Sequence, residues 1–261
     1  TIAICLMKIE PDVIAWDKLK NELDNWEKQD RVATFWWRDD DAADITPELL
    51  ELIHLSTDLM IPLVIAAIPF ALSNDFRAYC FPHSVKLAQH GYAHINHANF
   101  LSKKSEFCKA RSVKLRAMDI KNGFSSIMEL KQSIKIFVPP WNRIDNELLP
   151  ILQKIGFHSI STFAARLTPE PVKGLKQINT HVDLIDWNGN KAFVGDRIAI
   201  NYIVEHLKNK RLGYIDPTEP TGLLTHHLLH QSTCWSFLEK LFIEINAHPS
   251  ANWLEIENDA K

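Results

Sequence analysis

Residues 34–42 read T-F-W-W-R-D-D-D-A, an aromatic run that ends in three consecutive carboxylates. The aromatic part, residues 35–37, is typical of a buried strand, so Asp39, Asp40 and Asp41 are expected at its C-terminal end. Neighbouring carboxylates in a partly dry pocket repel one another, and they need a cation, a shared proton or an arginine nearby. A metal ion is the simplest solution, and a solvated acidic turn after the strand is the alternative.

The composition is that of a chain able to bury a sizeable core, because 46% of its 261 residues are apolar. This length suits one large domain or a barrel, so we predict a single domain over residues 1–261 with an N-terminal packing helix at about residues 11–29. The net charge is −3, and no block of lysine or arginine stands out. This pattern argues against a nucleic-acid partner and against a dedicated surface for acidic membranes.

No apolar run reaches the length of a transmembrane segment. Residues 1–8 are apolar but too short for a signal sequence with its cleavage site, so the cytoplasm is the default location. The first residue is not methionine, which leaves a removed leader open. Free thiols are expected, because the cysteines are scattered and form no metal-binding pair: Cys5, Cys80, Cys108 and Cys234.

Apolar runs alternate with helical patterns along the chain. Strands are predicted at residues 32–37, 62–69, 85–89, 134–138, 157–163, 177–187 and 222–229. Helices are predicted at residues 11–29, 46–59, 106–130 with an interruption at 122–123, 145–155, 196–208 and 234–245. This alternation favours parallel pairing, and we predict an α/β fold, a distorted (β/α) barrel of about seven strands.

The unusual polar residues follow these strands. They lie at residues 39–41, 90–97, 141–143, 183–186 and 226–227. The C-terminal ends of the strands in an α/β barrel meet at one mouth, where active sites are built. We therefore expect five separate segments to contribute to one site.

His90 and His94 are four residues apart, a spacing that can offer two imidazoles to one metal. Two such histidines alone are a weak signal, because loop histidines are usually only solvated. Together with a carboxylate from the first strand they form the ligand set of a catalytic zinc site with open positions for water and substrate.

The order of the motifs resembles the polysaccharide deacetylase family, also called the NodB-homology family or carbohydrate esterase family 4. That family opens with T-F-D-D-G, and R-D-D-D-A stands in the same place here. The further motifs are H-(S/T)-x-x-H, matched by residues 90–94, R-x-P-(Y/F/W), matched in part by 138–141, D-x-x-D-W, matched by 183–187, and L-x-x-H, matched by 223–226. The resemblance spans residues 34–229.

The resemblance implies a metal-dependent hydrolase that removes N-acetyl or O-acetyl groups from a carbohydrate, with zinc as the expected metal. It implies that Asp41, His90 and His94 bind the metal. It also implies that Asp40 is the general base that takes a proton from the attacking water, and that His226 is the acid that protonates the departing amine.

Six further residues are predicted to bind substrate or to support these groups: Asp39, Trp141, Arg143, Asp183, Trp187 and His227. The family pairs its acid with a carboxylate, which implies Asp183 here. Trp141 and Trp187 could stack on a sugar ring or could only cover the core. The L-x-x-H spacing selects His226 as the acid, so His227 is expected to point away from the mouth.

The first motif leaves its alignment open, because three aspartates stand where the family has two and Ala42 stands where it has glycine. Aligning Ala42 with that glycine makes Asp40 the base and Asp41 the ligand. A shift by one residue would instead make Asp39 the base and Asp40 the ligand.

The third motif lacks the arginine that braces the base in the family, because Val138 occupies its place. Arg38 or Arg143 could supply the missing guanidinium from a nearby segment. Two other functions stay open on these grounds. One is a degenerate barrel that binds glycan or metal without turnover, and the other is a metal-dependent amidase that acts on a small non-sugar amide.

Overall fold

The computed structural model describes residues 11–256. The predictions made for Cys5 and for residues 1–8 therefore lie outside the described residues. No helix within this range is both long and apolar enough to cross a bilayer.

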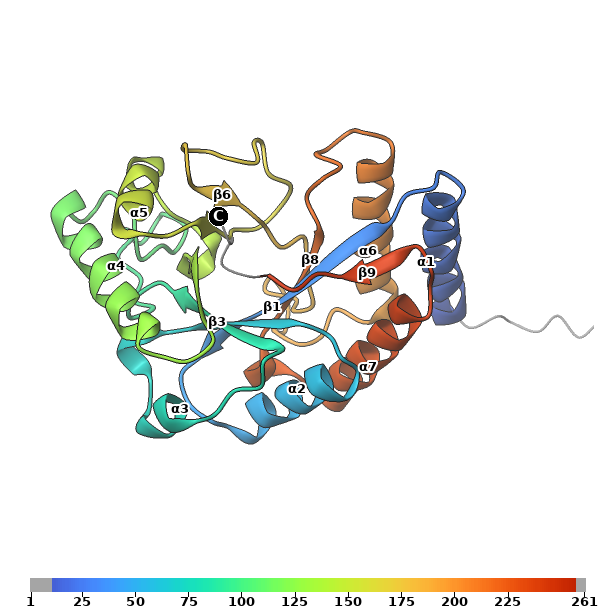
Figure 1. The fold of residues 1–261 in the computed structure, drawn as a ribbon, viewed down its shortest axis with the longest axis horizontal. Helices are drawn as coiled ribbons and strands as arrows, with labels where there is room; N and C mark the ends of the chain where they lie inside the picture. The colour runs from blue at the N-terminus through green and yellow to red at the C-terminus, as the bar shows by residue number, and fades with distance from the viewer. Residues whose placement is uncertain (1–10, 257–261) are drawn as a thin grey trace, which may run out of the picture.

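Nine strands of the described chain form one sheet, and all their pairings are parallel (Figure 1). The strands are β1 (Ala33–Ala42), β2 (Leu63–Ala67), β3 (Val85–His90), β4 (Ser133–Val138), β5 (Ser159–Ile160), β6 (Lys176–Gln177), β7 (Val182–Asp183), β8 (Thr221–Thr225) and β9 (Ala251–Trp253). Their order is β6-β5-β4-β3-β2-β1-β8-β7, with β9 paired to β1. The sheet curls into the distorted (β/α) barrel that the sequence predicts.

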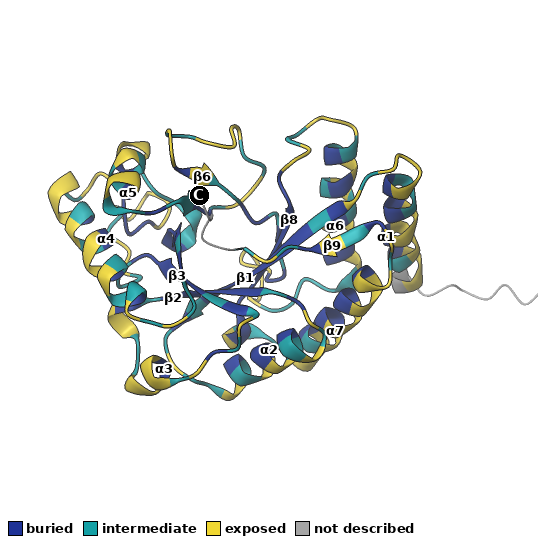
Figure 2. Cartoon of the chain, in the orientation of Figure 1, coloured by how far each residue is buried: buried dark blue, intermediate teal, exposed yellow. Residues whose placement is uncertain are grey.

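Within residues 11–256, seven α-helices and four short 3₁₀ turns connect and cover the strands. The helices are α1 (Pro11–Glu27), α2 (Pro47–Asp58), α3 (Asn74–Ala78), α4 (Val113–Met128), α5 (Leu149–Ile155), α6 (Asp196–Arg211) and α7 (Ser232–Asn246). The 3₁₀ turns are η1 (Pro69–Ala71), η2 (Pro140–Asn142), η3 (Asn146–Leu148) and η4 (His227–Leu229). Figure 2 shows that the strands are largely buried and that the helices expose only their outer faces.

One extended stretch, residues 176–183, joins the two edges of the sheet. Its first part pairs with β5 through β6, where the Ile178 N–H donates to the Ile160 carbonyl at 3.0 Å. Its second part pairs with β8 through β7, where the His181 N–H donates to the Gly222 carbonyl at 2.7 Å. A single segment therefore closes the barrel, and it does so within the predicted strand at 177–187.

The side chains of β1 alternate between the inside of the barrel and the surrounding helices, as the pleat of a strand requires. Trp36 lies in an inner cluster with Val64, Ala66, Ala88, Ile134, Ile136 and Val138. Trp37 points the other way and packs on Phe242 of α7, with 4.7 Å between ring centroids. Arg38 and Asp40 share the inner face with Trp36, which brings their charges together.

Several strand bounds differ from the prediction, and two of the differences lie at the predicted site. β1 continues through the three aspartates instead of stopping before them, and Asp39 and Asp40 are buried within it. β8 ends at Thr225, because His227 begins the turn η4. β9 and α3 were not predicted from the sequence.

The predicted interruption of the helix at residues 122–123 is wrong. The helix runs through Gly123 without a break. A Cβ at this position would lie 2.2 Å from Nε2 of Gln89 on β3, so the glycine allows close packing and does not end the helix.

Helix starts follow the expected chemistry. Thr46 caps α2, since its hydroxyl accepts the Leu49 N–H at 3.1 Å, and Pro47 occupies the first turn. The predicted N-terminal helix is α1, and its apolar stripe joins the main core through Ala15, Leu19, Leu23 and Trp26.

Candidate metal and catalytic site

Three residues from two strand ends converge at the mouth of the barrel. The Nε2 atoms of His90 and His94 lie 3.1 Å and 3.2 Å from the same carboxylate oxygen, Oδ1 of Asp41. The donor atoms of the three side chains all lie within 4.8 Å of one another. The three residues predicted to bind a metal are thus brought together, and Asp41, not Asp40, is the carboxylate beside the histidines.

The tautomer of His90 follows from its second contact. Its Nδ1 lies 3.1 Å from the carbonyl oxygen of Val138, which can only accept a hydrogen bond. Nδ1 must therefore carry a proton, and Nε2 is the ring nitrogen that faces Asp41 and could bind a metal. Metal-binding histidines are commonly oriented in this way by a carbonyl behind the ring.

The charges of the three groups are strongly coupled. Burial would raise the pKa of Asp41, but the hydrogen bond and charge of His90, with the charge of His94, hold it well below its usual range. Burial lowers the pKa of His94, and the charge of His90 lowers it further. Burial acts in the same direction on His90, yet the charges of Asp40 and Asp41 leave its pKa raised.

A buried glutamate that the sequence analysis missed shapes the loop between the two histidines. Glu106 accepts hydrogen bonds from the backbone N–H groups of Tyr92 at 3.1 Å and Ala93 at 2.7 Å, and burial raises its pKa. Gly91 has φ of +57°, and a Cβ there would meet Glu106 and the ring of Pro140. This explains why the chain has glycine where the family has serine or threonine.

Asp40 is held by an arginine two residues before it on the same face of β1. The Nε of Arg38 lies 2.8 Å from Oδ1 of Asp40, and a terminal nitrogen donates to Oδ2 at 3.0 Å. Arg38 is wholly buried and also donates to Ser161 Oγ at 2.6 Å and to Asn142 Oδ1 at 2.8 Å. Of the two arginines considered as replacements at Val138, Arg38 is the one that contacts Asp40.

Arg143, the other arginine considered, makes a different contact. Its guanidinium donates to the backbone carbonyl of Lys104 at 3.0 Å on the exposed side of the loop.

Asp39 occupies the outer face of β1 and contacts the segment after β8. Its carboxylate accepts the Thr225 hydroxyl at 2.7 Å and the His227 N–H at 3.0 Å, and it also contacts Nδ1 of His227. His227 is buried with it. Asp39 thus links β1 to the segment after β8. This role favours the alignment of the first motif in which Asp40 is the base and Asp41 is the ligand.

His226, the predicted acid, lies with Asp183 and Trp187. Its Nδ1 is 3.8 Å from Oδ1 of Asp183, longer than a hydrogen bond. The Trp187 indole donates to Oδ2 of Asp183 at 2.7 Å, and its ring meets that of His226 edge-on at 4.8 Å. Burial raises the pKa of Asp183, and His226 is near enough to Asp41 to lower the pKa of that carboxyl.

Trp141 packs on His94 from the opposite side of the site, with 4.4 Å between ring centroids. It is half-buried and Trp187 is more exposed, so both rings line the mouth. Positive φ angles gather at these positions: +73° at Asp41, +57° at His94 and +54° at Trp141. Backbone in this region is uncommon for such residues and is often found at functional sites.

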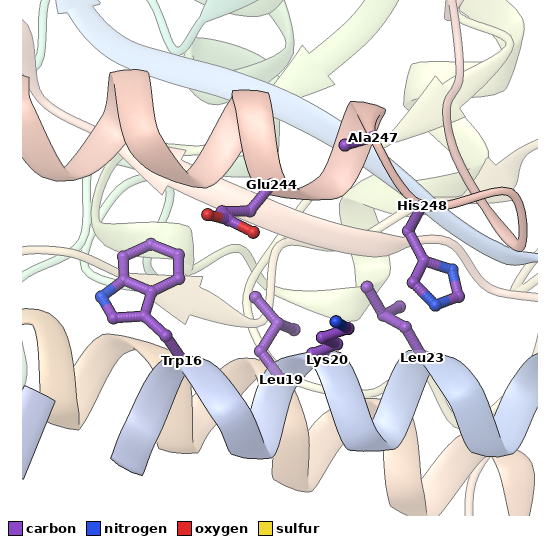
Figure 3. Close-up of a pocket in the computed structure, with 7 residues that line it drawn as sticks. All are labelled: Trp16, Leu19, Lys20, Leu23, Glu244, Ala247 and His248. Atoms are coloured by element: carbon purple, nitrogen blue, oxygen red, sulfur yellow. The ribbon is translucent and has the colours of Figure 1, made fainter. Parts of the chain in front are cut away.

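A separate groove lies between α1 and α7, and Figure 3 shows Trp16 and Glu244 facing each other across it with His248 at one end. The Nε2 of His248 lies 3.1 Å from Oδ1 of Asp24, and Glu27 completes a group of possible metal donors. Helices build this groove, and none of the predicted site residues lines it.

No family model matches the sequence, and no curated protein sequence matches it. The structure is similar to a family 4 carbohydrate esterase from Streptomyces lividans, with a TM-score of 0.51 and 13% identity over 88% of this chain and 98% of that chain. It is also similar to a peptidoglycan N-acetylglucosamine deacetylase, with a TM-score of 0.51 and 13% identity over 89% of this chain and 94% of that chain. A third similar structure is a family 4 pseudoenzyme from Bacillus anthracis, with a TM-score of 0.52 and 12% identity over 85% of this chain and 64% of that chain.

At 12–13% sequence identity, these structural similarities show the fold alone. The chain folds as the carbohydrate esterase family 4 polysaccharide deacetylases do, and the predicted resemblance is confirmed at that level. One of the three similar structures is a pseudoenzyme, so the fold does not by itself decide whether the chain turns over a substrate.

Proposed function

We propose that the chain is a metal-dependent hydrolase that removes N-acetyl or O-acetyl groups from a carbohydrate. The observation that carries this proposal is the convergence of two imidazoles on one oxygen of Asp41, next to a carboxylate, Asp40, that an arginine holds in place. In this arrangement Asp41 is the carboxylate available to a metal, and Asp40 is the carboxylate available for proton transfer.

The donor set fits a divalent metal, with zinc as our proposed choice. Asp41, His90 and His94 offer two nitrogens and one oxygen, the number that a catalytic zinc takes from the protein. A metal bound there would polarise the acyl carbonyl and activate a water molecule.

The residues of the chain then handle the protons. Asp40 accepts a proton from the attacking water, whose oxygen adds to the carbonyl carbon, while Arg38 fixes the orientation of the carboxylate. His226 gives a proton to the departing nitrogen as the carbon–nitrogen bond breaks, so the products are acetate and a free amine. Asp183 and Trp187 lie beside the His226 ring and hold its orientation by charge and by packing.

Carbohydrate is the proposed substrate because an aromatic ring lines each side of the mouth. Trp141 and Trp187 offer faces or edges on which a pyranose ring can pack.

The cytoplasm is our proposed location, which cell fractionation tests.

The test compares variants in metal content and turnover on chitin oligomers. Asp40→Asn should retain about one zinc per chain yet lose turnover by about two orders of magnitude or more. Asp41→Asn and His90→Ala should lose the metal, whereas His97→Ala, a histidine of the same loop outside the cluster, should keep it. Metal retained in both His90→Ala and His94→Ala would contradict the ligand assignment.

The same assay separates the competing functions. A degenerate barrel would bind metal but release no acetate, and an amidase for small amides would cleave a small amide and leave chitin oligomers intact. The degenerate barrel was suggested by the lack of an arginine at Val138. The guanidinium of Arg38 beside Asp40 weakens that argument, because it can take the place of the missing arginine. An activated acetyl ester serves as the third substrate, because its leaving group needs no proton from His226.

A further inference from the structure

An exposed apolar turn stands beside the candidate site. Residues 99–102 form a turn in which the Ser102 N–H donates to the Asn99 carbonyl at 2.8 Å. Its two corner residues are Phe100, which is 100% exposed, and Leu101, which is 95% exposed. Turn corners usually carry glycine, proline, asparagine, aspartate or serine, so a Phe-Leu pair in this position has no local structural reason.

The loop that carries this turn is fastened at its base. The His97 N–H donates to the Ser105 carbonyl at 3.0 Å, and the Ser105 N–H donates to Oδ1 of Asn96 at 2.9 Å. The same Asn96 oxygen accepts the Ala98 N–H at 3.1 Å. These hydrogen bonds fix the base of the loop, and Phe100 and Leu101 lie at its exposed tip.

Two further apolar side chains are exposed on this loop and on the segment bonded to it. Ile95, the residue after His94, is 52% exposed, and Phe70 on the loop after β2 is 69% exposed. Phe70 is joined to the histidine loop, since its N–H donates to the Tyr92 carbonyl at 2.9 Å and the two rings lie 5.6 Å apart. An apolar surface of this kind, with polar residues around it, is typical of an interaction site.

Basic side chains lie directly beside the apolar ones. Lys103 and Lys104 follow the turn and are exposed, and Lys109 is exposed a few residues further on. The one acidic residue within residues 95–111, Glu106, is buried beneath the histidine loop. This segment is therefore locally basic in a chain whose net charge is −3.

We propose that the loop of residues 95–104 docks on an anionic lipid bilayer, with Phe100 and Leu101 inserted among the headgroups and Lys103 and Lys104 on the lipid phosphates. Apolar side chains flanked by lysine are the combination that binds such an interface. The chain-wide charge argued against an acidic membrane surface because it averages over this local cluster. The mouth of the barrel would then face the bilayer, which goes beyond the proposed hydrolysis and does not depend on it.

The test measures binding of the full chain to vesicles by sedimentation, with phosphatidylglycerol in phosphatidylcholine against phosphatidylcholine alone. The wild type should bind the anionic vesicles, and salt should weaken the binding. Phe100→Ser with Leu101→Ser, and separately Lys103→Ser with Lys104→Ser, should each lower the affinity by roughly tenfold or more. The matched controls are Met60→Ser at another exposed apolar turn and Lys18→Ser with Lys28→Ser, on α1 and just after it, and they should bind as the wild type does.

Insertion is read separately with Leu101→Trp, whose fluorescence should shift to the blue and be quenched by brominated lipid. The proposal is overturned if the wild type does not bind anionic vesicles, or if the double variants bind as tightly as it does. It is also overturned if light scattering shows a dimer that Phe100→Ser with Leu101→Ser dissociates, because the surface would then pair two copies of the chain. None of these readouts requires turnover, so they fail or succeed independently of the proposed function.

Discussion

A buried arginine, Arg38, holds the carboxylate of Asp40 from two residues earlier on β1. In the family that the sequence resembles, the arginine beside the base comes from the third motif, where this chain has Val138. Residues two apart on a strand share one face, so the same strand can supply both the carboxylate and its counter-charge. Ser161 and Asn142 complete the contacts of the guanidinium from two other strand ends.

We predict that Arg38→Met destabilises the fold by about 3–5 kcal/mol, because it leaves the carboxylate of Asp40 buried without its partner. Arg38→Met with Asp40→Asn should recover much of this loss, because no unpaired charge is then buried. Urea unfolding of the two single variants and the double variant measures the coupling. Additive losses would show that the pair has no strong interaction.

At the scale of the element, helix α4 contains Gly123, a residue type with low helix propensity. Alanine in place of a helical glycine usually stabilises by about 1 kcal/mol. We predict that Gly123→Ala instead destabilises by about 1–3 kcal/mol, because its Cβ would meet Gln89 at 2.2 Å and Pro69 at 3.1 Å. Gln89 cannot move freely, since its amide donates to the Gly91 carbonyl at 2.7 Å and to the Ile120 carbonyl at 3.1 Å.

The control for this change is Asn122→Ala, the exposed residue beside it on the same helix, which should stabilise slightly. Both free energies come from chemical denaturation. A stabilising Gly123→Ala would mean that the strand and helix are free to separate. Since Gln89 also holds the turn after His90, Gly123→Ala should weaken zinc binding as well, and Asn122→Ala should not.

Helix α6 carries a lysine that makes stability depend on pH. Lys210 is 1% exposed, with Nζ 3.5 Å from the Thr221 hydroxyl and 5.4 Å from the Trp26 ring. Burial lowers the pKa of Lys210 to about 8, against the charge of Glu219, which raises it. The unfolded chain holds this proton up to its ordinary pKa of 10.5, so between pH 8 and 10.5 it binds more protons than the folded chain.

We therefore predict that the unfolding free energy of the wild type rises, relative to that of Lys210→Met, as the pH increases from 8 towards 10.5. Below pH 8 both states carry the proton, and the difference between the two proteins should be flat. Denaturation series at matched ionic strength measure both curves. A difference that stays constant from pH 7 to pH 10 would show that Lys210 keeps its proton when folded.

At the scale of the whole molecule, periodicity predicted most of the barrel because buried parallel strands are continuous apolar runs, as β2 is. The grouping of Asp41, His90 and His94 was predictable as well, since short motifs carry these three residues. Glu106 was not, because its contacts are with backbone N–H groups of a distant turn, which no spacing records. The split of residues 176–183 between two partners was equally hidden, since a short, mostly polar stretch of sequence gives no sign of where its pairing partner changes.

That closing stretch gives the last prediction, which concerns Gly222 on β8. A Cβ at Gly222 would lie 2.4 Å from the carbonyl oxygen of Asn179, 2.5 Å from the Trp36 indole nitrogen and 2.6 Å from Cα of Thr180. Two of these three atoms are backbone, and the Trp36 indole itself donates to the Asn179 carbonyl at 2.9 Å. Gly222→Ala should therefore push the closing stretch away from β8 and destabilise the protein by about 3 kcal/mol.

A matched control is Gly189→Ala, whose Cβ would come just as close to another atom, 2.3 Å from Oδ2 of Asp186. That atom ends an exposed side chain, which can move aside if it gives up its hydrogen bonds from the Asn188 and Gly189 N–H groups, so the loss should be about 1 kcal/mol. The comparison separates a clash with the barrel closure from a clash with a movable group. Hydrogen exchange should show faster exchange of the Ile178, Thr180 and His181 amides in Gly222→Ala, because these donate across the closure. Equal stability of the two variants would mean that residues 176–183 do not hold the barrel closed.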